Sequence, residues 1–505
     1  MSIYNNAADK AEKQLENISK TMCYAKWAQS SIHLTNGMTN SCYHPPLHKI
    51  DVKEVRLNPS ALHNTKQKKL ERNMMLQGER PEGCSYCWKI EDVGGRSDRI
   101  YRSGEEWAQN ARTDIFDVLD TKDINPRYLE INFNQACNFK CMYCSPHLST
   151  EWEKEVKLHG PFQVLDYDLS LQSHNDPKYL TMPLKVPNKE NPYVEAFWRW
   201  WPNLYKKLEI FRMTGGEPLM DNNTFKVLDY IYTHPNRYLE ISITSNLCPP
   251  KPEIMDKFIK KVQALEEIQI WEDPDRFNPG SGNHWYVNMA LKNFFLYVSL
   301  DGVGKQAEYM RDGLDYDVLV NNSHKFLDGT CNSLFSFINT FNILSVPSLK
   351  KFLELVLSFR EKYSKDNQGI KRIPIFDPNF THPDHEVHPR QRVLFDIPVL
   401  RNPAWLNFQI LPKEYEVYLE DAIKFMKDNS DVSNFVGFYD YEISKVERNL
   451  ALMRERDKID EHKLRVDRMN FAKFIQQYNL RRNLDFVTVF PELADFYLNS
   501  LKELK

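Results

Sequence analysis

The chain has 505 residues, with 66 Lys and Arg against 69 Asp and Glu and a formal net charge of −3 at pH 7. This balance excludes the basic footprint of most nucleic-acid-binding proteins, so we expect no nucleic acid as a partner. Hydrophobic residues make up 42% and charged residues 27%, which excludes a wholly disordered chain. The length predicts more than one domain, at about 100–200 residues per domain.

Targeting and membrane segments are not apparent in the sequence. No apolar run approaches the roughly 20 residues that a membrane helix needs. The first ten residues, MSIYNNAADK, are too polar for a signal peptide. We therefore expect a cytoplasmic protein that does not bind membranes.

Cysteines are concentrated near the N-terminus. In a long cytosolic chain, clustered thiols bind metal more often than they form disulfides. Of the nine cysteines, Cys248 and Cys331 stand alone, and the remaining seven are Cys23, Cys42, Cys84, Cys87, Cys137, Cys141 and Cys144.

The first hundred residues contain four of these cysteines and a basic helical pattern over 65–76. Because the overall charge is nearly neutral, we expect the basic side chains of this helix to form a solvated face. They are Lys66, Lys68, Lys69 and Arg72.

From about residue 125, strand-like runs alternate with helical patterns. Repeated strand–loop–helix units predict parallel strands in a sheet or partial barrel, with functional loops at the carboxyl ends of the strands. Strands are expected at 128–133, 208–213, 239–244, 294–299, 334–341 and 393–399, and helices over 225–232, 318–327 and 349–363. Pro and Gly over 273–282 indicate a loop insertion. Residues after about 413 are helical and highly charged.

Three cysteines, Cys137, Cys141 and Cys144, follow the first of these strands on one short loop. Three thiolates can hold three irons of a [4Fe–4S] cube and leave the fourth iron open for another ligand. A zinc site is the alternative. Tetrahedral zinc needs a fourth ligand, which His147 could supply on spacing alone.

A glycine pair marks the end of the second strand, in the segment TGGEP at 214–218. The chain uses only 17 glycines, so a pair at this point indicates a structural requirement. Glycine at a strand end lets the backbone approach a ligand closely.

Taken together, these segments resemble the radical S-adenosylmethionine (SAM) superfamily over residues 125–415. The resemblance lies in CNFKCMYC (137–144), TGGEP (214–218), ITSN (243–246) and VSLDG (298–302) with the later Arg311. It implies an α/β fold with a partial (βα)6 TIM-like barrel. It also implies that SAM chelates the open iron, and that its reductive cleavage gives a 5′-deoxyadenosyl radical that abstracts hydrogen.

The same resemblance implies a set of cofactor-binding residues and names no catalytic side chain. The glycine pair and the following glutamate would meet the SAM amino group, and Arg311 would pair with the carboxylate. Residues at later strand ends would contact the ribose and carboxylate, although Asp301 also suits a plain Asp-Gly turn. The full set is Tyr143, Gly215, Gly216, Glu217, Ser245, Asn246, Ser299, Asp301 and Arg311.

The four N-terminal cysteines occur in CxxxW and GCxxCW contexts that resemble the SPASM/Twitch auxiliary-cluster domains of radical SAM enzymes. The resemblance implies a second [4Fe–4S] cluster closed by Cys23, Cys42, Cys84 and Cys87. A four-cysteine zinc site has the same ligand count and remains an alternative. The expected domains are an auxiliary iron–sulfur domain at 1–105, the barrel at 125–415 and a helical C-terminal extension at 416–505.

We therefore expect a radical SAM oxidoreductase that oxidises a sugar-like small molecule and receives electrons from a donor such as flavodoxin or ferredoxin. Cys23 comes too early for the N-terminal winged helix that peptide-modifying relatives often carry, which favours a small molecule. The alternatives are a radical SAM enzyme acting on a peptide or protein, and a zinc-binding scaffold without catalysis. Two other groups of residues are expected to have no part in the site. The aromatic residues at 197–201 should pack against the barrel. The histidines His382, His385 and His388 should lie in a solvated loop.

Overall fold

The computed structural model describes residues 3–117, 122–165, 190–272, 285–288, 290–363, 391–432 and 436–504. The loop expected at 273–282 and the three histidines at 382, 385 and 388 lie outside these ranges. The chain divides into two compact units. The first comprises Met1–Gln135, Met182–Pro218 and Tyr238–Ile243, and the second comprises Ala136–Thr181, Leu219–Arg237 and Thr244–Lys505.

The first unit contains parallel strands that continue into a small antiparallel edge. Its strand order is β7-β6-β4-β1-β2-β3, in which β4 pairs in parallel with both β1 and β6. Alternating apolar residues of β4 explain its position, since Leu129 and Ile131 are completely buried. The strands are β1 (Gln29–His33), β2 (Met38–Asn40), β3 (His48–Lys49), β4 (Tyr128–Asn132), β6 (Ile210–Thr214) and β7 (Asn236–Ser245).

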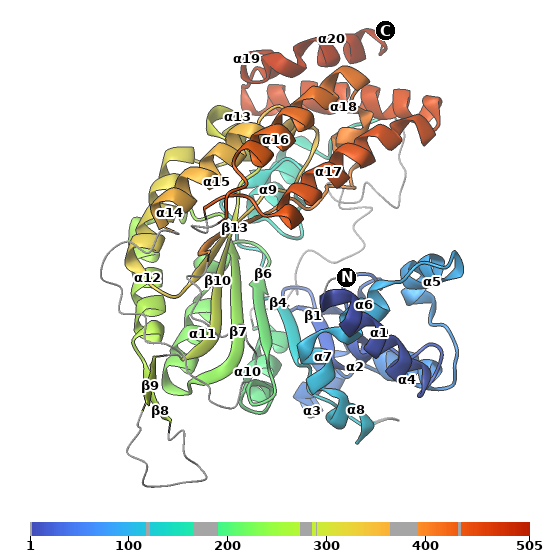
Figure 1. Ribbon diagram of the computed structural model, residues 1–505, viewed down its shortest axis with the longest axis vertical. Coiled ribbons are helices and arrows are strands. Elements are labelled where there is room, and N and C mark those ends of the chain that lie inside the picture. The colour runs from blue at the N-terminus through green and yellow to red at the C-terminus, as the bar shows by residue number, and fades with distance from the viewer. Residues whose placement is uncertain are drawn as a thin grey trace. The chain divides into compact units, whose positions relative to one another are not determined.

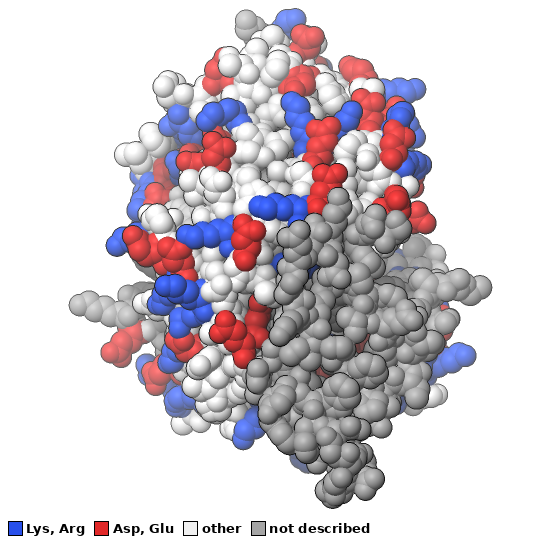
Figure 2. All heavy atoms as spheres, turned by 60° about the vertical axis from the view of Figure 1, so that its left-hand side comes forward, with Lys and Arg blue, Asp and Glu red and all other residues white. Residues whose placement is uncertain are grey.

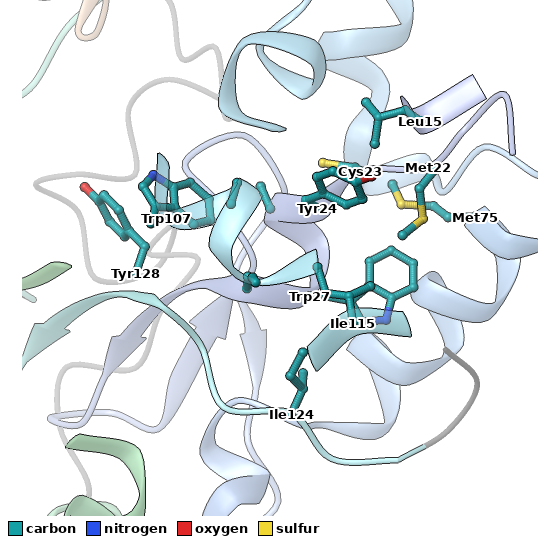
Figure 3. Close-up of a cluster of buried hydrophobic side chains, with 14 of the residues drawn as sticks. Leu15, Met22, Cys23, Tyr24, Trp27, Met75, Trp107, Ile115, Ile124 and Tyr128 are labelled. Atoms are coloured by element: carbon teal, nitrogen blue, oxygen red, sulfur yellow. The ribbon is translucent and has the colours of Figure 1, made fainter. Parts of the chain in front are cut away.

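Short helices surround β1 in this unit (Figure 1). Their apolar side chains form a core that includes Trp27, Trp107 and Ile115, with Cys23 beside Met22 (Figure 3). The helices are α1 (Ile3–Glu16), α2 (Tyr24–Ala28), α3 (Val52–Leu57), α4 (Lys66–Leu76), α5 (Ser85–Asp92), α6 (Asp98–Gly104), α7 (Glu106–Asn110), α8 (Arg112–Phe116) and α10 (Pro192–Tyr205).

The aromatic residues of α10 pack as expected. Phe197 and Trp201 are buried, and their rings lie 6.4 and 5.1 Å from that of Phe211 on β6. Asn191 caps the helix by accepting hydrogen bonds from the backbone N–H groups of residues 193 and 194. This cluster is therefore part of the protein core.

The second unit contains three parallel strands in the order β10-β12-β13 and two short antiparallel pairs, β5 with β11 and β8 with β9. Its strands are β5 (Lys140–Cys141), β8 (Gln269–Glu272), β9 (Trp285–Asn288), β10 (Leu291–Ser299), β11 (Arg311–Asp312), β12 (Leu334–Ile338) and β13 (Val393–Asp396). Its helices are α9 (Thr150–His159), α11 (Asn222–Thr233), α12 (Pro252–Glu266), α13 (Gly304–Met310), α14 (Tyr316–Gly329), α15 (Leu349–Tyr363), α16 (Glu416–Asp428), α17 (Asp440–Arg454), α18 (Glu461–Arg482), α19 (Phe486–Val489) and α20 (Ala494–Lys502).

All six strands expected from the sequence are present, and α15 has the predicted bounds. The fifth strand is shorter than predicted: β12 ends at Ile338, and Phe341 then forms only an isolated bridge with Val399. The three N-terminal strands were not predicted, because segments such as Gln29–His33 are short and polar. An α/β fold with parallel strands is confirmed, and closure into a barrel remains a prediction.

The prediction that the basic face of α4 is solvated is wrong for two of its side chains. Lys68 is completely buried and Arg72 is 1% exposed, whereas Lys66 lies at the surface. Inside the first unit, Lys68 donates hydrogen bonds to Ser30 on β1 and Thr39 on β2, and Arg72 donates to Asn64 in the turn before α4. These polar partners stabilise both side chains in the interior.

No helix within the described ranges is long and apolar enough to cross a membrane. On the face drawn in Figure 2, Lys and Arg side chains are interspersed with Asp and Glu, and no large area carries a single sign.

Candidate functional site

The loop that carries Cys137, Cys141 and Cys144 is held in place by the first turn of α9. Three side chains of this turn donate to backbone carbonyls of the loop. The three hydrogen bonds run from Ser149 Oγ to Phe139 O at 2.6 Å, from Thr150 Oγ1 to Cys137 O at 3.1 Å and from Trp152 Nε1 to Cys141 O at 2.8 Å. The loop is therefore fixed in conformation by its own neighbouring helix.

A short antiparallel pair fixes the other side of this loop. Cys141 on β5 lies opposite Arg311 on β11. Directly after β11, Gly313 has a φ of +105°, and a Cβ there would lie 2.8 Å from Asn138 O. Only glycine combines this backbone conformation with such a close approach to the cysteine loop.

Arg311, Asp301 and Tyr143 form one buried network beside the cysteines. The Arg311 guanidinium contacts both Asp301 carboxylate oxygens, at 2.8 and 3.0 Å, and donates to Cys141 Sγ at 3.5 Å. Tyr143 Oη donates to Asp301 Oδ2 at 2.7 Å and accepts from Arg311. The backbone N–H of Thr340 also donates to Asp301, at 2.8 Å. Asp301 thus holds Arg311, Tyr143 and the backbone of Thr340 together, in addition to its place in the Asp-Gly turn.

Burial and neighbouring polar groups act in opposite directions on the thiols of this loop. Burial raises the pKa of the Cys141 thiol, and the Arg311 guanidinium opposes that rise. Burial also raises the pKa of Cys144 to about 12. The Phe139 N–H donates to Cys137 Sγ at 3.4 Å. Sulfurs that accept hydrogen bonds and lie beside a cation are stabilised as anions, the form that binds metal.

The strand-end segment after β7 also meets the cysteine loop. Asn246 Nδ2 donates to Asn138 Oδ1 at 2.9 Å, and Asn138 Nδ2 donates to Cys248 O at 2.8 Å. Ser245 Oγ accepts from the N–H of Leu247 at 2.9 Å. The structure therefore brings Ser245 and Asn246 to the turn that supports the loop. Ser299 lies at the end of β10.

The glycine pair belongs to the first unit, at the end of β6. Gly215 has a φ of +115°, and a Cβ there would lie 2.4 Å from the side chain of Asn132 on β4. The Gly216 N–H donates to Asn134 O at 3.2 Å, and Glu217 is 2% exposed. Glycine is therefore required at position 215 by the tight turn after β6.

The four N-terminal cysteines line one cavity in the first unit. Cys23 precedes α2, Cys42 follows β2, and Cys84 and Cys87 lie at the start of α5. Burial raises the pKa of Cys42 to about 12 and that of Cys87 to about 11, and backbone N–H groups of His44 and Arg99 oppose these rises. The structure thus brings together four thiols that are far apart in the sequence.

As the side chains stand, no three His, Cys, Asp or Glu residues among the described ranges converge on a point that could hold a single metal ion. Four ligands of one zinc would all lie about 2.3 Å from it. Thiolates that bind separate irons of a cluster stand farther apart, so the shared cavity is compatible with a cluster.

A second buried charge network was not apparent from the sequence. Arg482 of α18 pairs with Glu155 of α9 and Asp312 of β11, each at 2.7 Å. Lys140, next to Cys141, contacts the same two carboxylates at 3.0 and 2.9 Å. Helix α18 is therefore tied to both elements that hold the cysteine loop. No local motif signals this link, because its members lie on four separate segments.

No family model matches the chain. It is 27% identical over 161 residues to a GTP 3′,8-cyclase of Trichormus variabilis and 26% identical over 161 residues to one of a Nostoc species. These matches cover 31% of this chain and 38% of each relative, so the chain matches less than half the length of these proteins. They support the radical SAM superfamily that the cysteine motif predicts.

Solved structures of SuiB from Streptococcus suis are also similar, at low scores. The form bound to S-adenosylmethionine is 13% identical with a TM-score of 0.29, covering 70% of this chain and 64% of SuiB. The form bound to the precursor peptide SuiA is 12% identical with a TM-score of 0.28, covering 67% and 61%. Scores of this size do not establish a common arrangement of the chains.

Proposed function

We propose that this chain is a radical SAM enzyme that holds a [4Fe–4S] cluster through Cys137, Cys141 and Cys144. The observation that carries the proposal is the fixed cysteine loop with the Arg311 guanidinium against one of its sulfurs. When bound, such a cluster and SAM supply a 5′-deoxyadenosyl radical that abstracts hydrogen from an unactivated C–H bond.

The residues of this chain would bind and orient the cofactor. Arg311 presents a positive charge held in place by Asp301, which suits the carboxylate of SAM. Gly215, Gly216 and Glu217 would meet the SAM amino group, as the resemblance to radical SAM enzymes implies. Side chains near the ribose and carboxylate would be Tyr143, Ser245, Asn246 and Ser299.

We further propose that Cys23, Cys42, Cys84 and Cys87 hold an auxiliary cluster of the Twitch type. The support is that the four thiols line one cavity although they are far apart in the sequence, and a four-cysteine zinc site is the alternative. Four protein thiolates leave no iron open, so this cluster would accept an electron from the substrate radical, and the net reaction would be an oxidation.

A small molecule that contains a sugar is the proposed substrate class. The support is the name of the two curated relatives, which gives GTP, a nucleotide, as their substrate. A peptide or protein substrate is the alternative. Anaerobic incubation distinguishes a small-molecule substrate from a peptide. Deuterium should appear in 5′-deoxyadenosine from a deuterated metabolite extract in the first case, and from a deuterated peptide mixture in the second.

Reconstitution with iron and sulfide tests the central proposal. The wild-type chain should bind both elements and cleave SAM to 5′-deoxyadenosine when reduced. Replacing Cys137, Cys141 and Cys144 with Ala should abolish cleavage, whereas Cys331→Ala, at an exposed and isolated thiol, should not. Cleavage that persists in the triple variant contradicts the assignment. Zinc in place of iron and sulfide would instead indicate a non-catalytic scaffold.

A further inference from the structure

A buried group of charged side chains lies beside the four-cysteine cavity and contains more cations than carboxylates. Lys26 lines this cavity and is only 2% exposed. Its ammonium donates to Glu71 Oε2 at 2.5 Å, and Gln67 Nε2 donates to the other oxygen of that carboxylate at 2.9 Å. Glu71 is therefore the direct carboxylate partner of Lys26.

Arg72 and Lys68 add to this positive charge. The hydrogen bonds described for Arg72 go to neutral groups: Lys26 O, Asn64 Oδ1 and His63 Nε2. Lys68 donates to two hydroxyl groups, and burial lowers its pKa well below the usual value. Even with Lys68 neutral, the charges of Lys26 and Arg72 both act on the Glu71 carboxylate.

A second carboxylate that acts on Arg72 is shared with a different lysine. Asp123 acts on Arg72 through its charge, but it forms an ion pair with Lys69 at 2.5 Å. A buried positive charge without an equal negative charge costs free energy. Four thiolates around an iron–sulfur core carry a net negative charge and would balance it.

Lys26 and the four thiols line the same cavity. Burial raises the pKa of the Cys84 thiol, and Lys26 opposes that rise through its charge and through a side-chain hydrogen bond. Lys26 also acts on Cys42 through its charge. The ammonium is therefore close enough to Cys84 and Cys42 for its charge to act on both thiols.

We propose that Lys26 raises the reduction potential of an iron–sulfur cluster held by Cys23, Cys42, Cys84 and Cys87, and that Glu71 limits this effect by partly neutralising the lysine. The proposal rests on the auxiliary cluster proposed above. Reduction adds one electron to the cluster and makes it more negative, so a nearby ammonium stabilises the reduced form. A carboxylate beside that ammonium acts in the opposite direction.

The test is a potentiometric titration, followed by electron paramagnetic resonance, of the full-length chain reconstituted with iron and sulfide. Lys26→Met should lower the equilibrium constant for reduction about tenfold, which is about 59 mV for one electron. Lys26→Arg keeps the charge and should stay near the wild-type potential. Glu71→Gln should raise the potential. The matched control is Lys53→Met, at an exposed lysine of α3.

Addition of SAM identifies the signals, since it perturbs the cluster with an open iron and leaves the closed cluster unchanged. Opposite shifts in Lys26→Met and Glu71→Gln support the proposal, because a general loss of stability would not produce opposite signs. An unchanged potential in Lys26→Met overturns it. If Lys26→Met fails to hold a cluster, an unchanged potential in Glu71→Gln overturns it instead.

Iron and sulfide analysis before the titration separates the two proposals. Zinc in the four-cysteine site would contradict the auxiliary cluster itself, and the role of Lys26 with it. Two iron–sulfur clusters with no effect of Lys26 or Glu71 on potential would contradict only the role of Lys26.

Discussion

Arg311 holds Asp301 through two contacts, from Nε to Oδ2 at 2.8 Å and from Nη2 to Oδ1 at 3.0 Å, and both side chains are buried. The same guanidinium donates to Cys141 Sγ, so one charged network joins the end of β10 to the cysteine loop. Arg311 therefore has a structural partner in addition to the SAM carboxylate proposed for it.

Removal of Arg311 should accordingly affect both affinity and stability. We expect Arg311→Ala to weaken SAM binding about tenfold or more, since a charge-assisted contact contributes roughly 1.5–3 kcal/mol. It should also lower the free energy of unfolding by about 3–5 kcal/mol, because Asp301 is left buried without its partner. Equilibrium dialysis with SAM and urea unfolding measure the two effects.

A double variant separates them. Arg311→Met with Asp301→Leu removes both charges, and apolar replacement of a buried pair is often nearly neutral for stability. The double variant should recover the free energy of unfolding without recovering SAM affinity. Wild-type SAM affinity in the double variant would remove Arg311 from the binding site.

The strands and the cysteine loop could be predicted from the sequence because their signals are local. Alternation of apolar residues marks 128–133, and the spacing of Cys137, Cys141 and Cys144 places three thiols on one loop. The bounds of α15 follow from its helical periodicity in the same way.

Contacts between distant segments could not be predicted. Lys68 and Arg72 have the sequence signature of a solvated helix face, yet both are buried, since their partners lie on β1, β2 and the turn before α4. The pairing of Arg482 with Glu155 joins residues on α18 and α9. Such contacts depend on the tertiary fold, which overrides local preference.

Gly313 provides a test of the cysteine loop that leaves every proposed ligand in place. Gly313→Ala adds a Cβ 2.8 Å from Asn138 O at a φ of +105°, so the loop must move. We expect this variant to lose the iron of the three-cysteine cluster and SAM cleavage while the chain stays folded. Iron and sulfide analysis after gel filtration, with circular dichroism, measures this.

The matched control for this change is Gly304→Ala. Gly304 also has a positive φ, +55°, but no atom lies within 4 Å of the added Cβ. It should lose only about 1–2 kcal/mol of stability and keep its iron. Equal iron loss in both variants would show that close contact at Gly313 is not the cause.

Arg482, at the end of α18, should stabilise the second unit. Arg482→Met removes the shortest ion pair of Glu155, which keeps Lys140 at 3.0 Å and Arg481 at 3.6 Å. We therefore expect a loss of about 1.5–3 kcal/mol in the free energy of unfolding, the contribution of a hydrogen bond to a charged group. Arg465→Met on the same helix removes an exposed pair with Glu503 and should change stability by no more than about 0.5 kcal/mol. Urea unfolding distinguishes the two, and equal effects would contradict a special role for Arg482.

His33 on β1 should make the stability of the chain depend on pH. Burial lowers its pKa to about 4, against about 6.5 in the unfolded chain. Between these values the unfolded chain binds more protons, so the free energy of unfolding falls as pH falls from about 6.5 towards 4. Above this window His33 is neutral in both states and contributes no slope. The loss should be on the order of 1–3 kcal/mol.

The measurement is urea unfolding at several pH values across this window, with the same metal loading in every sample. His33→Gln stays neutral throughout, so its stability should fall less steeply than that of the wild type. The control is His462→Gln, at an exposed position of α18, which should keep the wild-type slope. Since thiolate protonation at low pH affects all three proteins equally, the difference between their slopes isolates His33. Parallel slopes in His33→Gln and wild type would contradict the buried, neutral state of this histidine.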